Sequence, residues 1–482
     1  MASLDALAGN PAIRTLFGDP VALGEAGGFT VWRVGTVVAV VLGVWSTLAT
    51  TRITRGEEDA GRWGVLLAGR VRLRDVVGRH VVVVALVPLA AGLAAATALS
   101  SAGPDRAGAA VYGAGLAALG LFAVAVATLA AQIFPARAAA TGVTIAVLGA
   151  GLLARMIGDG LTALGWLRWL SPFGLIELSA PYAGNHPLPL LILLTAAILV
   201  YGAALAAADR RDVGGGLTAP ATGRPARLRL LATVEAFAVR RMLAPLAGWS
   251  AGVSAYFLLI GITSISVTDF LADNAAFVDA AAQAGFTELD RVEGFTAAIF
   301  ALLALPVGAF TAVRMAAFVA AEFDRRLIML AAQPLSRLRL LTAELTATIG
   351  GALVLVTSAA IATWVGVTVV GGDFALSAAL QGTWNTLPIV LLSAGAAILA
   401  TGIAPGAVTA FGCLPATGGF LLKVTADSAA APTWVANLSP FAHLAPVPLA
   451  AVDWRGALVM TGLAGVLTTT GAAAYRRRDL RG

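Results

Sequence analysis

The side chains of this sequence that could make charged contacts gather in one stretch, residues 51–80. It holds seven arginines and four acids and lies between two long apolar runs. Because each charge buried in hydrocarbon costs several kcal/mol, the stretch is expected to form a loop at one face of a membrane. Trp63, Leu66, Leu67 and Val71 recur at helical spacing with charges between them, which predicts a short amphipathic helix at the membrane surface. The alternative is a plain loop that only orients the chain.

Catalytic and metal-binding side chains are sparse by comparison. The single cysteine, Cys413, excludes an intramolecular disulfide, and His80, His186 and His443 stand far apart in the sequence. The one lysine, Lys423, has apolar neighbours, so the sequence contains no Gly-Lys-Ser/Thr element of a phosphate-binding loop. We expect no metal site, no cofactor held by this chain and no enzymatic activity of its own.

Composition places the chain in a membrane. Of its 482 residues 59% are hydrophobic and only 12% are charged, against about 25% charged residues in soluble proteins. Apolar runs of about 20 residues recur, which predicts an all-α polytopic membrane protein. The net charge of +6 comes with an excess of Lys and Arg in the loops on one side of the membrane, and it does not indicate a nucleic-acid partner. Eleven spans are expected: Thr30–Thr50, Val81–Leu99, Ala110–Phe134, Ala138–Leu153, Leu188–Ala207, Ala244–Ile265, Gly294–Phe318, Leu341–Val370, Ala375–Ile403, Val408–Leu422 and Gly456–Ala474.

The charged stretch has a second copy, and other short matches follow it in the same order. The segment 322–341 fits over 58–77 at an offset of 264. Three further matches keep offsets of 266 to 268: Gly28-Phe29-Thr30 with Gly294-Phe295-Thr296, Leu170–Phe173 with Leu438–Phe441, and Arg211-Asp212 with Arg478-Asp479. The chain is therefore interpreted as an internal duplication. The first repeat covers residues 1–243, including a cytoplasmic linker at about 209–243, and the second covers 244–482.

The two repeats differ at their starts. The span at 244–265 has a counterpart, at an offset of 266, that falls before Met1, so the first repeat has five spans and the second has six. We expect the native polypeptide to begin upstream with a twelfth helix. The alternative is an eleven-span protein with a translocated N-terminal tail.

Loop charges give the expected orientation. With residues 51–80 in the cytoplasm, 23 of the 32 Lys and Arg residues fall on that side and 7 on the other. This predicts a multi-pass protein of the cell membrane with a cytoplasmic C-terminus. Arg33 and Arg314 lie within spans and are expected to reach toward the interface. The aromatic segments around the two Leu-Ser-Pro-Phe motifs are expected to form short external helices, with Trp166 and Trp169 at the headgroup level.

Taken together, the chain resembles an ABC-2 type exporter permease. More narrowly, it resembles the double-length actinobacterial permeases associated with export of polyketide antibiotics, such as the tetronasin-type exporters. The match rests on residues 55–63 (RGEEDAGRW), 66–69 (LLAG) and 27–33 (GGFTVWR), the weaker second copy at 322–337, and both Leu-Ser-Pro-Phe motifs. It departs from the family at Arg70 and Arg72, where Pro and Ser are usual, and in the missing opening helix.

The resemblance implies a division of labour. Two copies of a separate cytoplasmic ABC ATPase would bind ATP and Mg, and this chain would form the path by which hydrophobic or amphipathic compounds leave the cell. An amphipathic coupling helix in each repeat would sit in a groove of each ATPase. The implied coupling residues are Glu57, Glu58, Asp59, Gly61, Arg62, Trp63, Leu66 and Leu67 in the first repeat, and Glu322, Asp324, Arg325, Arg326 and Leu330 in the second. The sequence names no substrate-binding residue.

Two other functions remain open at this stage. A secondary transporter with a duplicated helical bundle would have the same span pattern, although such carriers usually place ionisable groups in mid-span. A membrane scaffold without transport is the third class. A neighbouring gene for an ATPase with a phosphate-binding loop would separate the three.

Overall fold

The structure is a computed structural model that describes residues 14–15, 18–20, 22–103, 105–218, 229–273, 291–323, 334–428 and 431–478. Within these ranges the regular elements are all helical and no strand occurs. Eleven helices there are long and apolar enough to cross a membrane. The predicted all-α polytopic fold is confirmed. The chain divides into two compact units, unit 1 (Met1–Pro225) and unit 2 (Ala226–Gly482).

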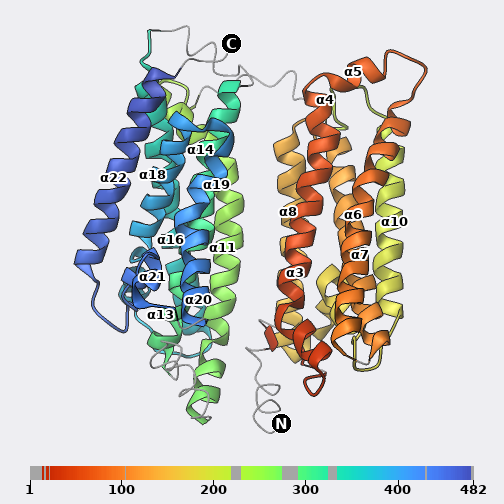
Figure 1. Ribbon diagram of the computed structural model, residues 1–482, viewed down its shortest axis with the longest axis horizontal. Helices are drawn as coiled ribbons and strands as arrows, with labels where there is room; N and C mark the ends of the chain where they lie inside the picture. Colours follow the sequence, from red (N-terminus) through yellow and green to blue (C-terminus); the bar gives the residue numbers. More distant parts are fainter. Residues whose placement is uncertain are drawn as a thin grey trace. The chain divides into compact units, whose positions relative to one another are not determined.

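Unit 1 is a bundle of five long helices (Figure 1). They are α3 (Ala26–Thr51), α6 (Leu73–Ala102), α7 (Arg106–Ile133), α8 (Arg137–Gly160) and α10 (Leu188–Ala208). Helix α7 is central, because it packs against each of the other four. It approaches α6 closely at Gly92 and Gly113, where a Cβ on Gly92 would lie 2.3 Å from the carbonyl oxygen of Gly113. Glycine at both positions therefore permits the contact.

Short helices cover the two ends of unit 1. One end carries the π-helix η1 (Arg52–Gly56), α4 (Glu57–Asp59) and α5 (Arg62–Leu66), and we call it the α5 end. The other carries the 3₁₀ helix η2 (Thr162–Leu170) and α9 (Pro172–Leu178), and we call it the α9 end. Figure 1 shows α4 and α5 together at the top of this unit. The short helices predicted around the first Leu-Ser-Pro-Phe motif are present.

Unit 2 repeats the core of unit 1 and has one further long helix among the described residues. Its elements are α11 (Val234–Asp273), α13 (Val292–Leu302), α14 (Ala304–Phe323), α16 (Arg337–Val369), α17 (Leu376–Trp384), α18 (Leu387–Ile403), η3 (Pro405–Ala407), α19 (Val408–Cys413), η4 (Leu414–Gly418), α20 (Gly419–Ser428), α21 (Thr433–Ala436), η5 (Pro440–His443) and α22 (Trp454–Arg477). Helix α18 packs against α14, α19 and α22, as α7 packs against α3, α8 and α10. Helix α11 packs along α16 and has no counterpart among the described residues before α3.

Prolines divide two predicted spans of unit 2. The segment 294–318 was predicted as one span, and the structure breaks it between α13 and α14. Helix α13 ends four residues before Pro306, and α17 ends four residues before Pro388. Because proline has no N–H to donate to the carbonyl four residues earlier, each break falls where that hydrogen bond is missing.

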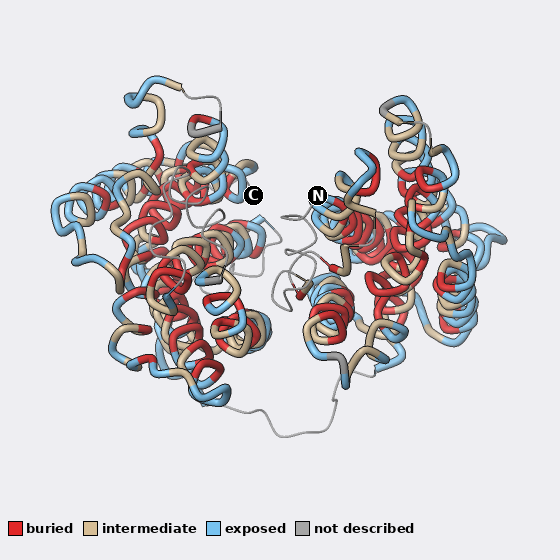
Figure 2. The backbone as a smooth tube through the Cα atoms, turned by 90° about the horizontal axis from the view of Figure 1, so that it is seen from below, coloured by how far each residue is buried: buried red, intermediate tan, exposed pale blue. Residues whose placement is uncertain are grey.

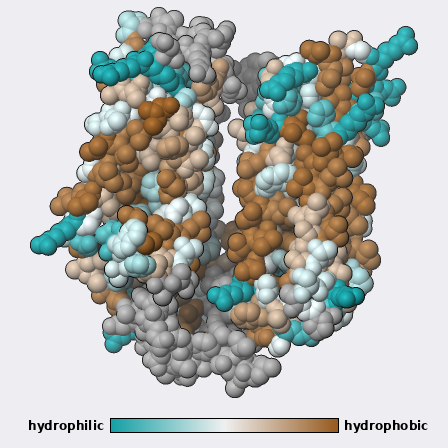
Figure 3. Space-filling view, viewed as in Figure 1, coloured by the Kyte–Doolittle hydropathy of each residue, from teal (hydrophilic) through white to brown (hydrophobic). Residues whose placement is uncertain are grey.

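The surface of each unit fits a bilayer. Buried residues face inward within each bundle and exposed residues face outward (Figure 2). On the visible face of each unit, hydrophobic side chains cover the middle and hydrophilic ones gather toward the ends (Figure 3). The visible face of each helical bundle thus has an apolar middle and polar margins, the arrangement that a hydrocarbon layer between two aqueous phases requires.

Candidate functional site

The predicted coupling segment of unit 1 is helical but is not one helix. Helix α3 continues through η1 into α4, and the chain then turns at Gly61, whose φ is +74°. Helix α5 follows at once. The single amphipathic helix expected from the spacing of Trp63, Leu66, Leu67 and Val71 is wrong, because α5 ends at Leu66 and the last two of these residues follow it. Gly61 separates α5 from α4, because a residue in the left-handed region ends a right-handed helix.

The apolar residues of α5 divide between the two sides of the helix. Trp63 is almost completely buried, and its ring lies 5.5 Å from the ring of His80, between centroids. Leu67 packs against the buried apolar cluster that contains Trp63, Val76 and Val77. Val65 and Leu66, in contrast, are 81% and 50% exposed. Trp63 thus anchors the segment to the body of unit 1, whereas Val65 and Leu66 are presented outward.

Exposed charges surround these outward residues. The side chain of Arg62 is 68% exposed and lies 3.0 Å from the Glu57 carboxylate. Asp59, Arg70 and Arg72 are also exposed, as is Val71. We call this set the α5 surface; it comprises Asp59, Arg62, Val65, Leu66, Arg70, Val71 and Arg72. It combines apolar and charged groups on the outer side of a segment that is anchored beneath.

Glu58 is turned inward and is held by three groups. Its two oxygens lie 2.6 and 2.7 Å from the two terminal nitrogens of Arg211, a bidentate pair. The amide of Gly214 donates to it at 2.7 Å, and Arg55 lies 3.2 Å away. Both the Glu58 and the Arg211 side chains are 1% exposed. Glu58 is therefore a residue that fixes the segment and offers no exposed carboxylate.

The Glu58–Arg211 pair joins elements that are distant in the chain. Arg211 follows α10, and its Nε donates to Gln132 near the end of α7 at 2.8 Å. Arg55, on η1, donates to the carbonyls of Phe134 and Gly215 at 2.6 and 2.7 Å. The ends of α3, α7 and α10 are thus tied together beneath α4. Removing one partner of such a buried pair costs about 3–5 kcal/mol.

Unit 2 contains the same pair at the equivalent positions. Glu322, in α14, lies 2.5 Å from Arg478, which follows α22. Arg478 also donates to the carbonyl of Thr401 near the end of α18 at 3.0 Å. Its guanidinium lies over the rings of Phe323 and Tyr475. We call Glu58–Arg211 and Glu322–Arg478 the Glu–Arg clamps.

Four of the five predicted coupling residues of unit 2 follow α14, namely Asp324, Arg325, Arg326 and Leu330. All four lie outside the described residues. Glu322 is the one member of that set that the structure describes, and it faces Arg478.

Comparison with known proteins gives the family. The family model described as "Multidrug efflux system permease Rv1217c, C-terminal domain" matches residues 2–208 and 231–476. The chain is also 31% identical over 497 residues to the multidrug efflux system permease protein Rv1217c of Mycobacterium tuberculosis (strain ATCC 25618 / H37Rv), a match that covers all of this chain and 87% of the relative. The chain belongs to this family. It is a multi-pass membrane permease.

A second charge network distinguishes unit 2 of the permease. The Glu344 carboxylate accepts from Arg241 of α11 and Arg314 of α14, both at 2.8 Å. Arg314 was expected to reach toward the membrane interface, and instead it is buried against Glu344. At the repeat offset of 264, Glu344 falls on His80 and Arg314 on Thr50. Unit 1 therefore lacks the corresponding ion pair.

Sequence reasoning missed the arginine partners in both clamps. Arg211-Asp212 and Arg478-Asp479 were recognised as a repeat match, but nothing linked them to Glu58 and Glu322, which stand 153 and 156 residues away. The repeat itself could have linked them. The two glutamates are related by an offset of 264 and the two arginines by an offset of 267, which is nearly the same.

Proposed function

We propose that this permease is the membrane subunit of an ATP-driven exporter, which moves hydrophobic or amphipathic compounds out of the cell. Two copies of a separate cytoplasmic ABC ATPase bind ATP and Mg, and this chain forms the path across the membrane. Membership in a family of multidrug efflux permeases supports the transport role. The narrower proposal, that the compounds include polyketide antibiotics of the tetronasin type, follows the resemblance of residues 55–63 to that group.

The α5 surface is the single observation that carries the ATPase partnership. Val65 and Leu66 are apolar and strongly exposed, yet the segment beneath them is held by the buried Trp63 and the buried Glu58. Exposed apolar groups on an anchored element, ringed by charges, suit a protein contact with an apolar centre and a polar rim. The side chains of Arg62 and Asp59 would give that contact its register through charge-assisted hydrogen bonds.

The Glu–Arg clamps supply the mechanical link in this proposal. Movement of an ATPase against α5 would pass through Glu58 to Arg211 and through Arg55 to Phe134, and so to the ends of α10 and α7. The Glu322–Arg478 clamp would do the same for α22 and α18. ATP-driven closure of the two ATPases would then rearrange both bundles and alternate access across the membrane.

Orientation follows from the same proposal. The α5 end of unit 1 faces the cytoplasm, as does the C-terminus, which agrees with the excess of Lys and Arg in those loops. The protein then lies in the cell membrane with its C-terminal arginines inside, and α9 and η2 lie at the outer face.

A pull-down experiment tests the partnership. The double variant Val65→Asp/Leu66→Asp places charge on the apolar centre of the α5 surface without touching the Glu58–Arg211 clamp. We expect a neighbouring gene to encode the ABC ATPase, and copurification of its co-expressed product to fall at least tenfold. The control is Leu231→Asp, which alters an exposed leucine in the segment before α11, outside both Glu–Arg clamps. Unchanged retention of the ATPase by the double variant would contradict the proposal.

A further inference from the structure

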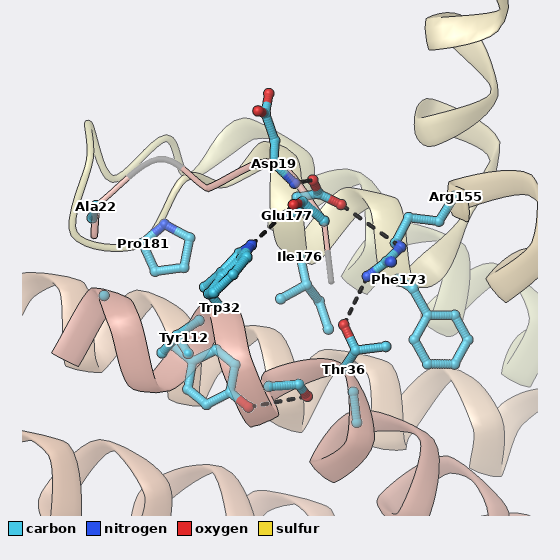
Figure 4. Close-up of a pocket in the computed structure, with 15 residues that line it drawn as sticks. Asp19, Ala22, Trp32, Thr36, Tyr112, Arg155, Phe173, Ile176, Glu177 and Pro181 are labelled. Carbon is cyan, nitrogen blue, oxygen red and sulfur yellow. Dashed lines mark hydrogen bonds and ion pairs between the residues drawn. The ribbon is translucent and has the colours of Figure 1, made fainter. Parts of the chain in front are cut away.

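The charged side chains at the α9 end of unit 1 satisfy one another. The Nε of Arg155 lies 3.1 Å from Asp159 of α8 and 3.8 Å from Glu177 of α9. The two carboxyl groups are hydrogen-bonded to one another, which requires one shared proton. Figure 4 shows Arg155 and Glu177 beside a small cavity of about 70 Å³, whose wall includes Trp32 and Tyr112. This cluster therefore ties α8 to α9 and needs no ligand to balance its charge.

Helix α8 continues past the end that hydropathy predicted for it. The fourth span was predicted to stop at Leu153, which placed Arg155 and Asp159 in a loop. Helix α8 instead runs to Gly160. The charges did not end the helix because they neutralise one another at one-turn spacing inside the bundle.

A groove at the opposite end of unit 1 has a different balance of charge. It has a volume of about 480 Å³, lies between α6 and α10, and is open along one side. Helix α6 begins at the α5 end and α10 finishes there, and the two helices pack against one another. Arg74 and Arg79 line the charged part of the groove, and Val82, Tyr201 and Leu205 line the rest. One part of the groove is therefore basic and the other largely apolar.

The guanidinium groups of the groove are weakly paired. Arg79 is exposed and has no ion pair within 4 Å among the described residues. Arg74 lies 3.3 Å from Asp209, but the two side chains are 55% and 42% exposed. An ion pair so exposed contributes at most about 1 kcal/mol, so Arg74 is free to turn toward a stronger partner.

Asp75 also lines the groove, but its charge is met elsewhere. It lies in the first turn of α6, where the unpaired amides at the start of the helix stabilise a carboxylate. Residues 72–79 hold three arginines against this one acid, and Arg210 is exposed beside Asp209. The basic part of the groove therefore keeps a net positive charge even when Asp209 is counted.

A hydroxyl group stands next to these arginines, with space in front of it. The hydroxyl of Tyr201 has no hydrogen-bond partner among the described residues and lies beside Gly78 of α6. A Cβ on Gly78 would lie 3.6 Å from that oxygen, and a longer side chain would enter the groove. Glycine at this position keeps the space open, so Tyr201 is able to donate to a group that enters.

The apolar walls continue from the groove toward the middle of the bundle. Val82 is 59% exposed, and Leu86, one turn further along the same face of α6, is 58% exposed. On α10, Ile198 stands about one turn from Tyr201 and is 61% exposed. These side chains face the hydrocarbon of the membrane. A basic end and an apolar path thus form one continuous strip, which suits a molecule with an anionic head and hydrocarbon chains.

We propose that this groove binds an anionic glycerophospholipid, at a site distinct from the ATPase contact and independent of the proposed export. The phosphate accepts hydrogen bonds from Arg74, Arg79 and Tyr201, and the acyl chains lie along Val82 and Leu205. A zwitterionic lipid also has a phosphate, but its ammonium group is repelled by the same guanidinium groups. The groove therefore prefers the anionic lipid.

The proposed lipid site belongs to unit 1. At the repeat offset of 264, Arg74 falls on Leu338 and Arg79 on Ala343. At 267, Tyr201 falls on Thr468. The corresponding positions of unit 2 thus have neither guanidinium group, and we expect one such lipid per chain.

Native mass spectrometry tests the proposal on the full chain released from nanodiscs that hold equal amounts of phosphatidylglycerol and phosphatidylcholine, with no ATPase present. We expect one phosphatidylglycerol to stay bound per chain, in at least tenfold excess over phosphatidylcholine. Arg79→Gln, which removes the unpaired guanidinium, should lower that retention at least tenfold. Gly78→Leu, which fills the groove without changing charge, should do the same. Tyr201→Phe should lower it about three- to tenfold, the effect of one hydrogen bond.

The matched control is Arg476→Gln, which removes an exposed arginine from the last turn of α22 and should leave retention unchanged. Equal retention of the two lipids, unchanged retention in Arg79→Gln, or an equal loss in Arg476→Gln would overturn the site. Displacement of the lipid by an equal concentration of free glycerol phosphate would show that the groove holds a soluble phosphate ester, and would also overturn it. Because the assay contains no ATPase, each of these results would leave the ATP-driven export proposal standing.

Discussion

The two units of the permease build the same Glu–Arg clamp into different surroundings. In unit 1 both side chains are 1% exposed and Arg211 binds Glu58 through two nitrogens. In unit 2 the side chains of Arg478 and Glu322 are 15% and 12% exposed, and aromatic rings lie under the arginine. A contact kept through duplication while its setting changed indicates a shared task, which we take to be holding the coupling segment to the last helix of each unit.

Among the described residues, the units differ most at helix α11. Helix α11 of unit 2 contributes Arg241 to the Glu344–Arg314 network, and unit 1 has His80 and Thr50 at the equivalent positions of Glu344 and Arg314. Unit 1 instead concentrates buried charge at its α9 end, around Arg155. The duplicated core therefore carries the same clamps, whereas the other buried ion pairs lie at different positions in the two units.

Breaking the clamp of unit 1 should have the largest effect. Glu58→Ala leaves Arg211 and Arg55 buried without their carboxylate, so we expect a loss of about 3–5 kcal/mol in the free energy of unfolding. Denaturation of the purified chain in mixed micelles measures it. Glu57→Ala, which removes only a surface partner of Arg62, is the matched control and should change stability by less than about 1 kcal/mol. Equal effects of the two changes would show that burial of Glu58 contributes nothing.

Breaking the clamp of unit 2 should lower the free energy of unfolding by less than breaking the clamp of unit 1. Arg478 keeps its hydrogen bond to Thr401 and its two aromatic neighbours when Glu322→Ala removes the carboxylate. We expect a loss of about 1.5–3 kcal/mol, the usual contribution of a hydrogen bond to a charged group. The same denaturation assay applies. A loss larger than that of Glu58→Ala would reverse the ranking of the two clamps.

Replacing the serine in each of the two Leu-Ser-Pro-Phe motifs should give the smallest difference between the units in free energy of unfolding. Ser171 accepts from the amides of Phe173 and Gly174, whereas Ser439 accepts from Phe441 alone among the described amides. Each also donates to a glycine carbonyl. We expect Ser171→Ala to cost about 1–2 kcal/mol and Ser439→Ala about 0.5–1 kcal/mol. Thr97→Ala, on an exposed face of α6, serves as the neutral reference, and a costlier Ser439→Ala would contradict the reasoning.

Hydropathy and repetition predicted most of the fold, because span length and apolar composition are local properties of the chain. The eleven spans and the equivalence of Glu58 with Glu322 followed from them. Pairings did not, since Arg211 reaches Glu58 only after the bundle has assembled. Hydropathy also treats every charge as a loop signal, which is why the end of α8 at Arg155 was missed and why Arg314 was expected at the interface. Hydropathy assigns a value to each residue separately, so it cannot show that two buried charges neutralise one another.

Transport by the reconstituted complex tests the central claim most directly. The permease and its co-expressed ATPase are placed in proteoliposomes, and uptake of a fluorescent amphiphile into inside-out vesicles is followed with ATP and Mg. Our account predicts uptake that requires ATP hydrolysis, persists when ionophores remove ion gradients, and is lost in Val65→Asp/Leu66→Asp but not in Leu231→Asp. Uptake without ATP that is driven by a proton or sodium gradient would contradict it and would establish a secondary transporter.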